Sequence, residues 1–366
     1  MASQLVPGDV LQKSDKILFI THLALGDYTY LQNCFHAFAR AYPHMRVHLW
    51  VDEVLRTTDA SKWEYLKKQA LFDWLAASPF INKVYNRTYC PQVFQESIIE
   101  AQQEDYPLVV SLATLRPYQY ARLARKISPH GYVTGIKGAT GFLSMHHHLA
   151  YRRLDAVLPA YKVSKDHPQH ISDVHADWFR QLFGIEIAPE ARFPFVHIPE
   201  QWSERARKTL AEWDFSHRSG KLVFINPYAK TKKRCWPLDR VAELIMAMSA
   251  SERWRDACFI INAVPQQVET AKKILEGYPL KRTHLFSAQE NFFELPATLS
   301  QCDLVISVET AVMHLANAVH VPVIALMRQK NPEWVPIDSA NSTVIKTAQR
   351  RDWVKEITVD KVMGVL

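Results

Sequence analysis

The sequence lacks several features that would place it in well-known protein classes. No apolar stretch is long enough to cross a membrane as a helix, and residues 1–16 lack the apolar core of a secretory signal. The five cysteines have no CxxC spacing, and their odd, scattered count is typical of buried thiols in a reducing cytoplasm. No nucleic-acid-binding module is recognisable. We therefore expect a cytoplasmic globular protein with no nucleic acid partner.

The phosphate-binding and metal-binding signatures of common enzymes are also missing. No G-x-G-x-x-G follows the first predicted strand and no P-loop is present, so the dehydrogenase and kinase classes lack their phosphate cradle. His146, His147 and His148 are adjacent, and consecutive positions in regular structure cannot all face one ion. No HExxH or Cys/His spacing accompanies them. The sequence thus predicts neither a metal site nor a bound cofactor.

What the sequence does contain is typical of a soluble protein with an anionic partner. Its 366 residues are enough for two domains, and 48% are hydrophobic while 22% are charged. The formal net charge of +7 favours nucleotide phosphates or an acidic membrane surface as partners. A peripheral position on a membrane surface that carries acidic lipid is consistent with that charge.

Strands and helices alternate along the first half, which predicts a parallel sheet with helical crossovers. The segment 131–160 is rich in Gly and His and gives no clear prediction. The expected strands are 16–21, 46–51, 83–85 and 107–111, and the expected helices are 28–41, 61–77, 92–104, 120–126 and 171–183, the last ending at the natural C-cap Gly184.

A second series of the same kind follows a segment with three prolines at 187–200. We predict an α/β protein of two doubly wound, Rossmann-like domains facing each other across a cleft, with ligands beyond the carboxyl ends of the strands. The predicted domains are 1–195 and 196–345, and segment 346–366 is expected to pack back toward the first. In the second series the expected strands are 222–226, 257–262, 284–286, 304–306 and 321–326, and the expected helices are 202–213, 240–250, 267–276, 292–300, one from Thr310, and 360–366.

The most informative segment is 304–326, which predicts a buried strand, a polar turn at Glu309-Thr310, a short helix and a second buried strand. A helix starting at Thr310 directs unpaired N–H groups and its positive dipole end toward the carboxyl edge of the sheet, where phosphates are stabilised. His314 lies one turn on, on the same helix face. Alternatively, Thr310 is only a helix cap and His314 an ordinary half-buried histidine.

A basic loop follows strand 222–226 and carries Lys230, Lys232, Lys233 and Arg234. At the carboxyl edge of a sheet such a cluster can neutralise a diphosphate, with Arg binding it bidentately. A solvated surface loop is the alternative. The loop and Thr310 are expected at the same edge, which favours an anion site.

Gly26-Asp27 follows the first strand, and Gly26 would permit a tight turn there. Asp27 either caps the following helix or serves as the base that removes a proton from an attacking hydroxyl. Residue type and position leave both roles open.

Taken together, these motifs resemble glycosyltransferase family 9, the ADP-heptose lipopolysaccharide heptosyltransferases, which have the two-domain GT-B fold. Glu309-Thr-Ala-Val-Met-His-Leu-Ala-Asn-Ala with Val321-Pro-Val-Ile-Ala-Leu is similar to the family's signature. Three more segments match in order: 22–27 with a helix ending near Tyr42-Pro43, 226–237, and 267–272.

The resemblance implies an inverting transfer of heptose from ADP-heptose to a sugar hydroxyl of the lipopolysaccharide inner core, without a metal ion. It implies that Arg234, Lys233 and Lys230 bind the diphosphate, and that Arg234 also stabilises the leaving ADP. Thr310 and Ala311 add N–H groups, Glu309 binds donor hydroxyls and His314 joins the donor side. Glu269 approaches the ribose, and Asp27 is the general base. The implied acceptor is an anionic, lipid-linked oligosaccharide, for which Arg116, Tyr118 and Arg122 are the candidate contacts.

The sequence also departs from the family pattern. Glu309 replaces Asp, Ala311 replaces Gly, Arg234 aligns with the diphosphate-binding Lys, and Met327-Arg328 replaces Phe-Gly. In the acceptor region, the family's Asp-x-x-Gly-Leu-x-Lys-Ser is replaced by segment 111–117. These departures leave open another nucleotide-sugar donor, a protein acceptor, or a non-catalytic relative that binds nucleotide sugar or carbohydrate.

Overall fold

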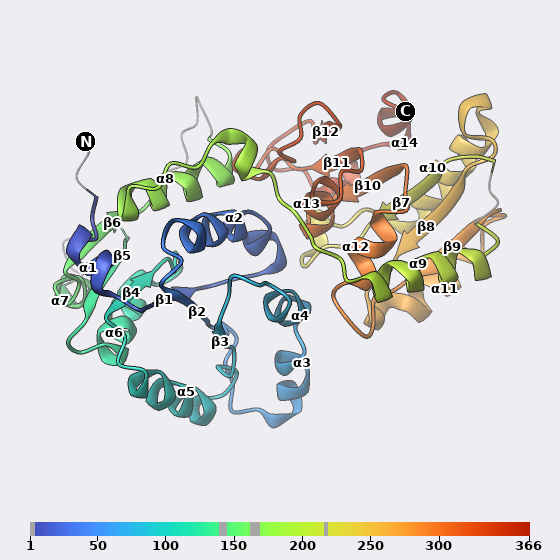
Figure 1. The fold of residues 1–366 in the computed structure, drawn as a ribbon. Helices are drawn as coiled ribbons and strands as arrows, with labels where there is room; N and C mark the ends of the chain where they lie inside the picture. The colour runs from blue at the N-terminus through green and yellow to red at the C-terminus, as the bar shows by residue number, and fades with distance from the viewer. Residues whose placement is uncertain (1–3, 139–144, 162–168, 216–218) are drawn as a thin grey trace. The chain divides into compact units, whose positions relative to one another are not determined.

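The chain forms two compact units, Met1–Arg192 and Phe193–Leu366, which are described here one at a time. The computed structural model describes residues 4–138, 145–161, 169–215 and 219–366 (Figure 1). The division after Arg192 is close to the domain boundary expected at residue 195.

The first unit is built on a six-stranded parallel sheet with the order β3-β2-β1-β4-β5-β6. Because β1 pairs with both β2 and β4, the strand order reverses beside it, which is the doubly wound arrangement (Figure 1). The strands are β1 (Lys16–Thr21), β2 (Arg46–Val51), β3 (Lys83–Tyr85), β4 (Leu108–Ser111), β5 (Tyr132–Lys137) and β6 (Ala156–Pro159).

Helices cover both faces of this sheet. Successive side chains of β1 point to opposite faces, so they contribute to an apolar core on each face. Phe19 packs against Phe35, Phe38, Phe179 and Phe183 of helices α2 and α8, with ring centroids 5.0 to 6.0 Å away. On the other face, Leu18 and Ile20 join the core under α5 and α6. The helices are α1 (Gly8–Lys13), α2 (Leu25–Ala41), α3 (Trp63–Lys67), α4 (Ala70–Ala76), α5 (Pro91–Gln103), α6 (Pro117–Ile127), α7 (Met145–Tyr151) and α8 (Ile171–Phe183), with 3-10 turns η1 (Ala60–Lys62) and η2 (Pro189–Arg192).

The second unit repeats this topology with a parallel sheet of order β12-β11-β10-β7-β8-β9. Here β7 pairs with both β10 and β8, so the reversal lies between β7 and β10. Ligands of doubly wound sheets bind beyond the carboxyl ends of the strands at this point. The strands are β7 (Leu222–Asn226), β8 (Cys258–Asn262), β9 (Thr283–Phe286), β10 (Leu304–Val308), β11 (Val323–Met327) and β12 (Ser342–Lys346).

A large apolar core of the second unit packs helix α10 onto strands β7, β8 and β10. The helices are α9 (Glu200–Glu212), α10 (Leu238–Ala250), α11 (Val268–Leu275), α12 (Glu294–Leu299), α13 (Ala311–Ala318) and α14 (Val359–Met363). The 3-10 turns are η3 (Lys232–Arg234), η4 (Glu252–Trp254), η5 (Pro265–Gln267), η6 (Pro332–Trp334) and η7 (Val354–Glu356).

The C-terminal segment contributes to this same core, and its expected packing toward the first domain stays a prediction. Val354, Ile357 and Val362 are fully buried in the core of the second unit. The indole Nε1 of Trp236 donates a hydrogen bond to the Ile357 carbonyl at 2.9 Å. The apolar side chains of the segment therefore cover α10 of their own unit.

Helix α8 and its Gly184 cap, with φ of 70°, agree with the prediction, whereas other elements differ from it. Helix α2 begins at Leu25 rather than Tyr28, and the helix expected over 61–77 is divided into η1, α3 and α4. Strands β5, β6 and β12 were not predicted. The patterns of β6 and β12 are mixed, with exposed residues beside buried ones, because both are edge strands.

His175 on α8 provides a test of the packing of the first unit. It is only 5% exposed, its Nδ1 has no hydrogen-bond partner among the described residues, and burial, with His170 nearby, lowers its pKa from 6.5 to about 3. As the pH falls, His175 therefore binds a proton in the unfolded chain before it does so in the folded protein. The free energy of unfolding is highest above the pKa of the unfolded chain and decreases as the pH falls below it. Because of His175, we expect the free energy of unfolding to decrease by about 2 kcal/mol when the pH is lowered from 7 to 5.

When the pH is lowered from 7 to 5, the free energy of unfolding of the His175→Phe variant should decrease by about 2 kcal/mol less than that of wild type. Denaturant unfolding followed by circular dichroism measures both decreases. The exposed His130 provides the matched control, since His130→Phe should leave the pH dependence unchanged. Equal acid sensitivity in wild type and His175→Phe would contradict the burial argument.

Candidate functional site

The carboxyl edge of the second sheet carries a polar cluster at the point where strand order reverses. Thr310 is the N-cap of α13, and its Oγ1 accepts a hydrogen bond from the Val312 amide at 3.3 Å. The same Oγ1 accepts from Asn226 Nδ2 at 3.0 Å. Thr310 therefore caps the helix, as the simpler reading of the sequence has it. The amide end of α13 also lies beside the loop that follows β7, as the anion-site hypothesis requires.

Asn226 connects three strands at this edge. Its Nδ2 also donates to Ser307 Oγ at 3.0 Å, and its Oδ1 accepts from Asn262 Nδ2 at 2.9 Å. Asn226 is 2% exposed and Ser307 is fully buried. This network fixes the ends of β7, β8 and β10 together and so positions the loops that leave them. Sequence analysis did not single out these three side chains, although each stands at or next to the end of a buried strand.

Glu309 is the buried carboxylate around which the charged side chains of this edge are arranged. It is 3% exposed, and its carboxylate faces two guanidinium groups, Arg234 Nη1 at 3.9 Å and Arg328 Nε at 3.4 Å. Asn331 Nδ2 donates to the same carboxylate at 3.5 Å. A buried carboxylate requires such partners, since an unpaired charge in the interior is strongly unfavourable. Arg234 and Glu309, predicted as donor-binding residues, are thus together.

The basic loop around η3 surrounds Arg234 with exposed cations. Lys230, Lys232 and Lys233 are all exposed, whereas Arg234 is half-buried. Lys233 Nζ lies 5.8 Å from the centroid of the Trp353 ring, and the Trp236 amide donates to the Pro227 carbonyl at 2.9 Å. The loop is therefore held at its base, and its cationic side chains remain available to an anion.

Of the other residues predicted at the donor side, two belong to this edge. Ala311 is the first residue of α13 and is half-buried, so the helix-end amides are partly accessible. His314 is 3% exposed and lies with its ring 6.0 Å from that of Trp334. Glu269 is an exposed residue in the first turn of α11 and makes no hydrogen bond or ion pair within the described ranges.

In the first unit, Asp27 is inside α2 rather than in the turn before it. Its Oδ2 accepts a hydrogen bond from the Ala24 amide at 3.0 Å, so the carboxylate caps the helix from its third residue. Gly26 is likewise helical, has no positive φ, and a Cβ there would meet no atom within 4 Å. Gly26 is therefore part of the helix and not of the tight turn that we expected there. Capping and proton abstraction remain compatible, because the Asp27 side chain is half-buried and therefore partly accessible.

The three candidate acceptor residues lie at the start of α6. Arg116 is the exposed N-cap, with φ of 50°. The Tyr118 ring packs against the His147 ring with centroids 3.9 Å apart and planes tilted by 31°, and Arg122 donates to the His146 carbonyl at 3.2 Å. The histidine cluster thus lies on helix α7 and packs against two of the candidate residues.

Beside them is a buried network around Asp52, and of its members the sequence analysis considered only Tyr120, as a residue that either lines the acceptor side or packs in the core. Asp52, directly after β2, is 8% exposed and accepts hydrogen bonds from Arg56 at 2.6 Å and from the Tyr120 hydroxyl. Burial raises the pKa of Asp52 despite these partners. The His22 ring lies 4.5 Å from Tyr120, both its nitrogens are unpartnered among the described residues, and burial, helped by Arg116, lowers its pKa to about 4. A polar residue directly after a buried strand was the available signal for Asp52.

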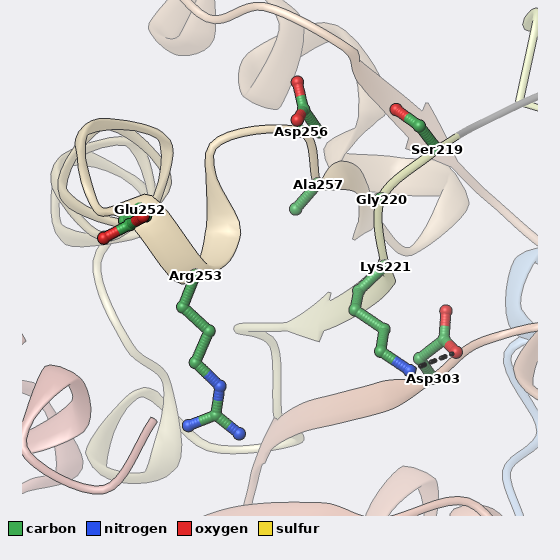
Figure 2. A pocket seen from close by; sticks show the side chains of 8 residues that line it. All are labelled: Ser219, Gly220, Lys221, Glu252, Arg253, Asp256, Ala257 and Asp303. Atoms are coloured by element: carbon green, nitrogen blue, oxygen red, sulfur yellow. Dashed lines mark hydrogen bonds and ion pairs between the residues drawn. The ribbon is translucent and has the colours of Figure 1, made fainter.

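A cavity of about 450 Å³ lies at the opposite, amino edge of the second sheet (Figure 2). Lys221 and Asp303 form an ion pair of 3.3 Å on its wall, and Asp256 pairs with Arg282 at 3.2 Å. None of the predicted donor-binding residues lines it. Its position at the amino ends of β7 and β8 argues against a nucleotide-sugar site there.

Two searches of the described residues bear on metals and membranes. No group of three or more His, Cys, Asp and Glu side chains is arranged to hold a metal ion within those residues. Among the helices formed by the described residues, none has both the length and the apolar character needed to span a bilayer.

A comparison with protein families identifies the chain. The description "Glycosyltransferase family 9 (heptosyltransferase)" matches residues 142–361, which is more than half of the sequence. The chain belongs to glycosyltransferase family 9. It is therefore a glycosyltransferase of the heptosyltransferase family, as the signature around Thr310 indicated.

Solved structures show the same GT-B fold, two Rossmann-like units each built on a parallel six-stranded sheet. A glycosyl transferase family 9 structure from Veillonella parvula has a TM-score of 0.70 at 16% identity, covering 99% of this chain and 97% of that one. E. coli ADP-heptose LPS heptosyltransferase II has a TM-score of 0.65 at 16% identity, covering 95% and 96%. E. coli heptosyltransferase WaaC with ADP has a TM-score of 0.62 at 15% identity, covering 96% of each chain. Comparison with curated protein sequences found no match.

In the second unit of this family 9 glycosyltransferase, the departures from the pattern that the family resemblance implies lie around one carboxylate. Arg234 and Arg328 both face Glu309, and Ala311 is two residues from it. The longer Glu309 side chain thus comes with a guanidinium in place of a Lys and another in place of a Gly. These substitutions change the charge and shape of one edge together.

Proposed function

We propose that this family 9 glycosyltransferase transfers a heptose from ADP-heptose to a sugar hydroxyl of the lipopolysaccharide inner core. The observation that supports it most is the convergence of Arg234, Glu309 and the amide end of α13 at one sheet edge. A helix N-terminus and a guanidinium together favour a diphosphate, and a buried carboxylate can accept hydrogen bonds from sugar hydroxyls.

The proposed reaction is a single displacement. The acceptor oxygen forms a bond to the anomeric carbon while the bond from that carbon to the diphosphate oxygen breaks, and the configuration inverts. Asp27 takes the proton of the acceptor hydroxyl. Arg234, aided by Lys233 and Lys230, stabilises the charge that develops on the leaving ADP. These cations and the helix end provide the electrostatic stabilisation that a divalent metal supplies in other enzymes, so we propose a metal-independent reaction.

The acceptor side of the proposal rests on charge. Arg116 and Arg122 are exposed cations at the start of α6, and the chain carries a net charge of +7. A lipid-linked, anionic oligosaccharide at the inner membrane surface would be attracted both by these arginines and by the net positive charge. Basic proteins are attracted to acidic lipid headgroups. We propose a peripheral association with that surface.

The test is turnover with a panel of nucleotide sugars. Purified protein is incubated with ADP-heptose or UDP-linked sugars and a lipid A–core acceptor that lacks heptose, and ADP release and the mass of the product are measured. Transfer of one heptose from ADP-heptose alone is expected. Turnover with another donor would replace the proposed substrate, and donor binding without any turnover would favour a non-catalytic relative.

A further inference from the structure

A second cluster of cations lies at the carboxyl edge of the second sheet, on β11 and β12. The last residues of these strands, Met327 and Lys346, are register partners, and Arg328 follows directly. A cavity of about 240 Å³ opens here. Its lining consists of Met327, Arg328, Gln329, Lys330, Pro332, Val335 and Lys346. Three of these seven residues are cations and none is an acid.

Arg328 is the central feature of this cavity. Its side chain is only 12% exposed, and both its backbone amide and its Nε face Glu309 Oε2 at 3.4 Å. Glu309 thereby holds the Arg328 guanidinium only through the edge that carries Nε. The Nη1 and Nη2 groups have no hydrogen-bond partner among the described residues, so a planar pair of donors remains unused. That pair matches the two oxygens of a carboxylate or phosphate.

The surroundings of Arg328 strengthen its attraction for an anion. Lys330 and Lys346 are exposed on the cavity and have no ion-pair partner in the described part of the chain. Met327, Pro332 and Val335 supply apolar walls. Charge interactions are stronger beside such walls than in open water, because the local dielectric constant is lower.

The size of the cavity limits what it can hold. Sites for whole small-molecule ligands are usually about 300–1,000 Å³, and this cavity is smaller. It therefore suits a charged substituent rather than a complete nucleotide. Glu309 faces both Arg328 here and Arg234 on the basic loop, so the substituent would belong to a molecule bound at the same sheet edge.

We propose that this cavity, named here the Arg328 pocket, binds a phosphate or carboxylate group carried by a sugar substrate, separately from the donor diphosphate. The anion is on either the transferred sugar or the acceptor, and both would present the same chemistry to Arg328. The inference deepens the proposed function by adding a charged group to a substrate. Its test measures binding alone, so it does not depend on which donor is used.

The experiment is calorimetric titration of the full-length protein with inorganic phosphate and with a hexose 6-phosphate, each with and without saturating ADP. The uncharged hexose is the comparison. We expect the hexose phosphate to bind also in the presence of ADP, and the Arg328→Gln variant to bind it at least about tenfold more weakly, as for loss of one charge-assisted contact. Arg255→Gln removes an exposed arginine near the amino end of β8 and should leave binding unchanged.

Two further measurements test the Arg328 pocket independently of the Arg328→Gln variant. Lys346→Gln leaves Glu309 and its partners in place and should weaken binding several-fold, which covers the case in which Arg328→Gln does not fold. Titration with a nucleotide sugar whose sugar carries a carboxylate, set against a phosphorylated lipid A–core oligosaccharide, separates donor from acceptor as the source. Binding that ADP abolishes, or that is equal in wild type, Arg328→Gln and Lys346→Gln, would overturn the Arg328 pocket. Failure of the ADP-heptose assay alone would instead overturn the proposed function.

Discussion

Replacement of Asp27 by asparagine is expected to lower kcat about 10²- to 10⁴-fold, the range for loss of a general base. Asparagine keeps a side-chain oxygen that can accept the Ala24 amide, so the cap of α2 survives and only the proton acceptor is lost. ADP binding should be unchanged, because the basic loop and Thr310 belong to the second unit. Steady-state kinetics and ADP titration measure the two effects.

The same variant separates the two roles that the sequence left open for Asp27. If the carboxylate only caps α2, Asp27→Asn should be nearly as active as wild type, and the proposed base would be wrong. Asp239 is the matched control, since it is an exposed first-turn aspartate of α10. Asp239→Asn should leave kcat within about twofold of wild type, because surface changes away from a site have small effects.

Replacement of Arg234 by glutamine is expected to weaken ADP binding about 10- to 150-fold. One charge-assisted hydrogen-bonding contact contributes about 1.5–3 kcal/mol, and each 1.4 kcal/mol is a factor of ten. The kcat/KM should fall further, since the guanidinium also stabilises the charge on the departing diphosphate. Arg234→Lys should restore part of the affinity, because it keeps the charge but loses the bidentate geometry.

Lys232 gives the control for this prediction. It lies in the same 3-10 turn as Arg234, is exposed, and was not assigned to the diphosphate. Lys232→Gln should change the affinity for ADP less than about threefold at physiological salt, as expected for a screened surface charge. Equal losses in Arg234→Gln and Lys232→Gln would mean that the loop acts only through its overall charge.

The sequence was most informative where a local pattern determines a local structure. The buried strand, polar turn and short helix around Thr310 need only neighbouring residues, and they form as predicted. The convergence of Arg234 with that turn also followed from the pattern, because parallel strands bring their carboxyl ends to one edge. The segment that resembles the family signature includes Glu309 and Thr310 of this turn.

Other features depend on contacts that no local pattern reveals. The partners of Glu309 include Arg328 and Asn331, which meet it only because β10 and β11 are neighbours. Asp52 and Tyr120 are far apart in sequence and join through the sheet of the first unit. Edge strand β12 has alternating exposure and no apolar run, and it escaped prediction for that reason. The position of Asp27 within α2 depended on a helix start that ordinary capping residues do not mark.

The bond between Trp236 and Ile357 also has a consequence for biosynthesis. The first unit has its complete sheet and both its cores by Arg192, so it can fold while the rest of the chain is still being made. The loop bearing Arg234, in contrast, rests on Ile357, which follows Trp236 by 121 residues. The second unit therefore cannot complete the support of this loop until Ile357 has been synthesised, and a nascent chain stalled shortly before Ile357 would lack it.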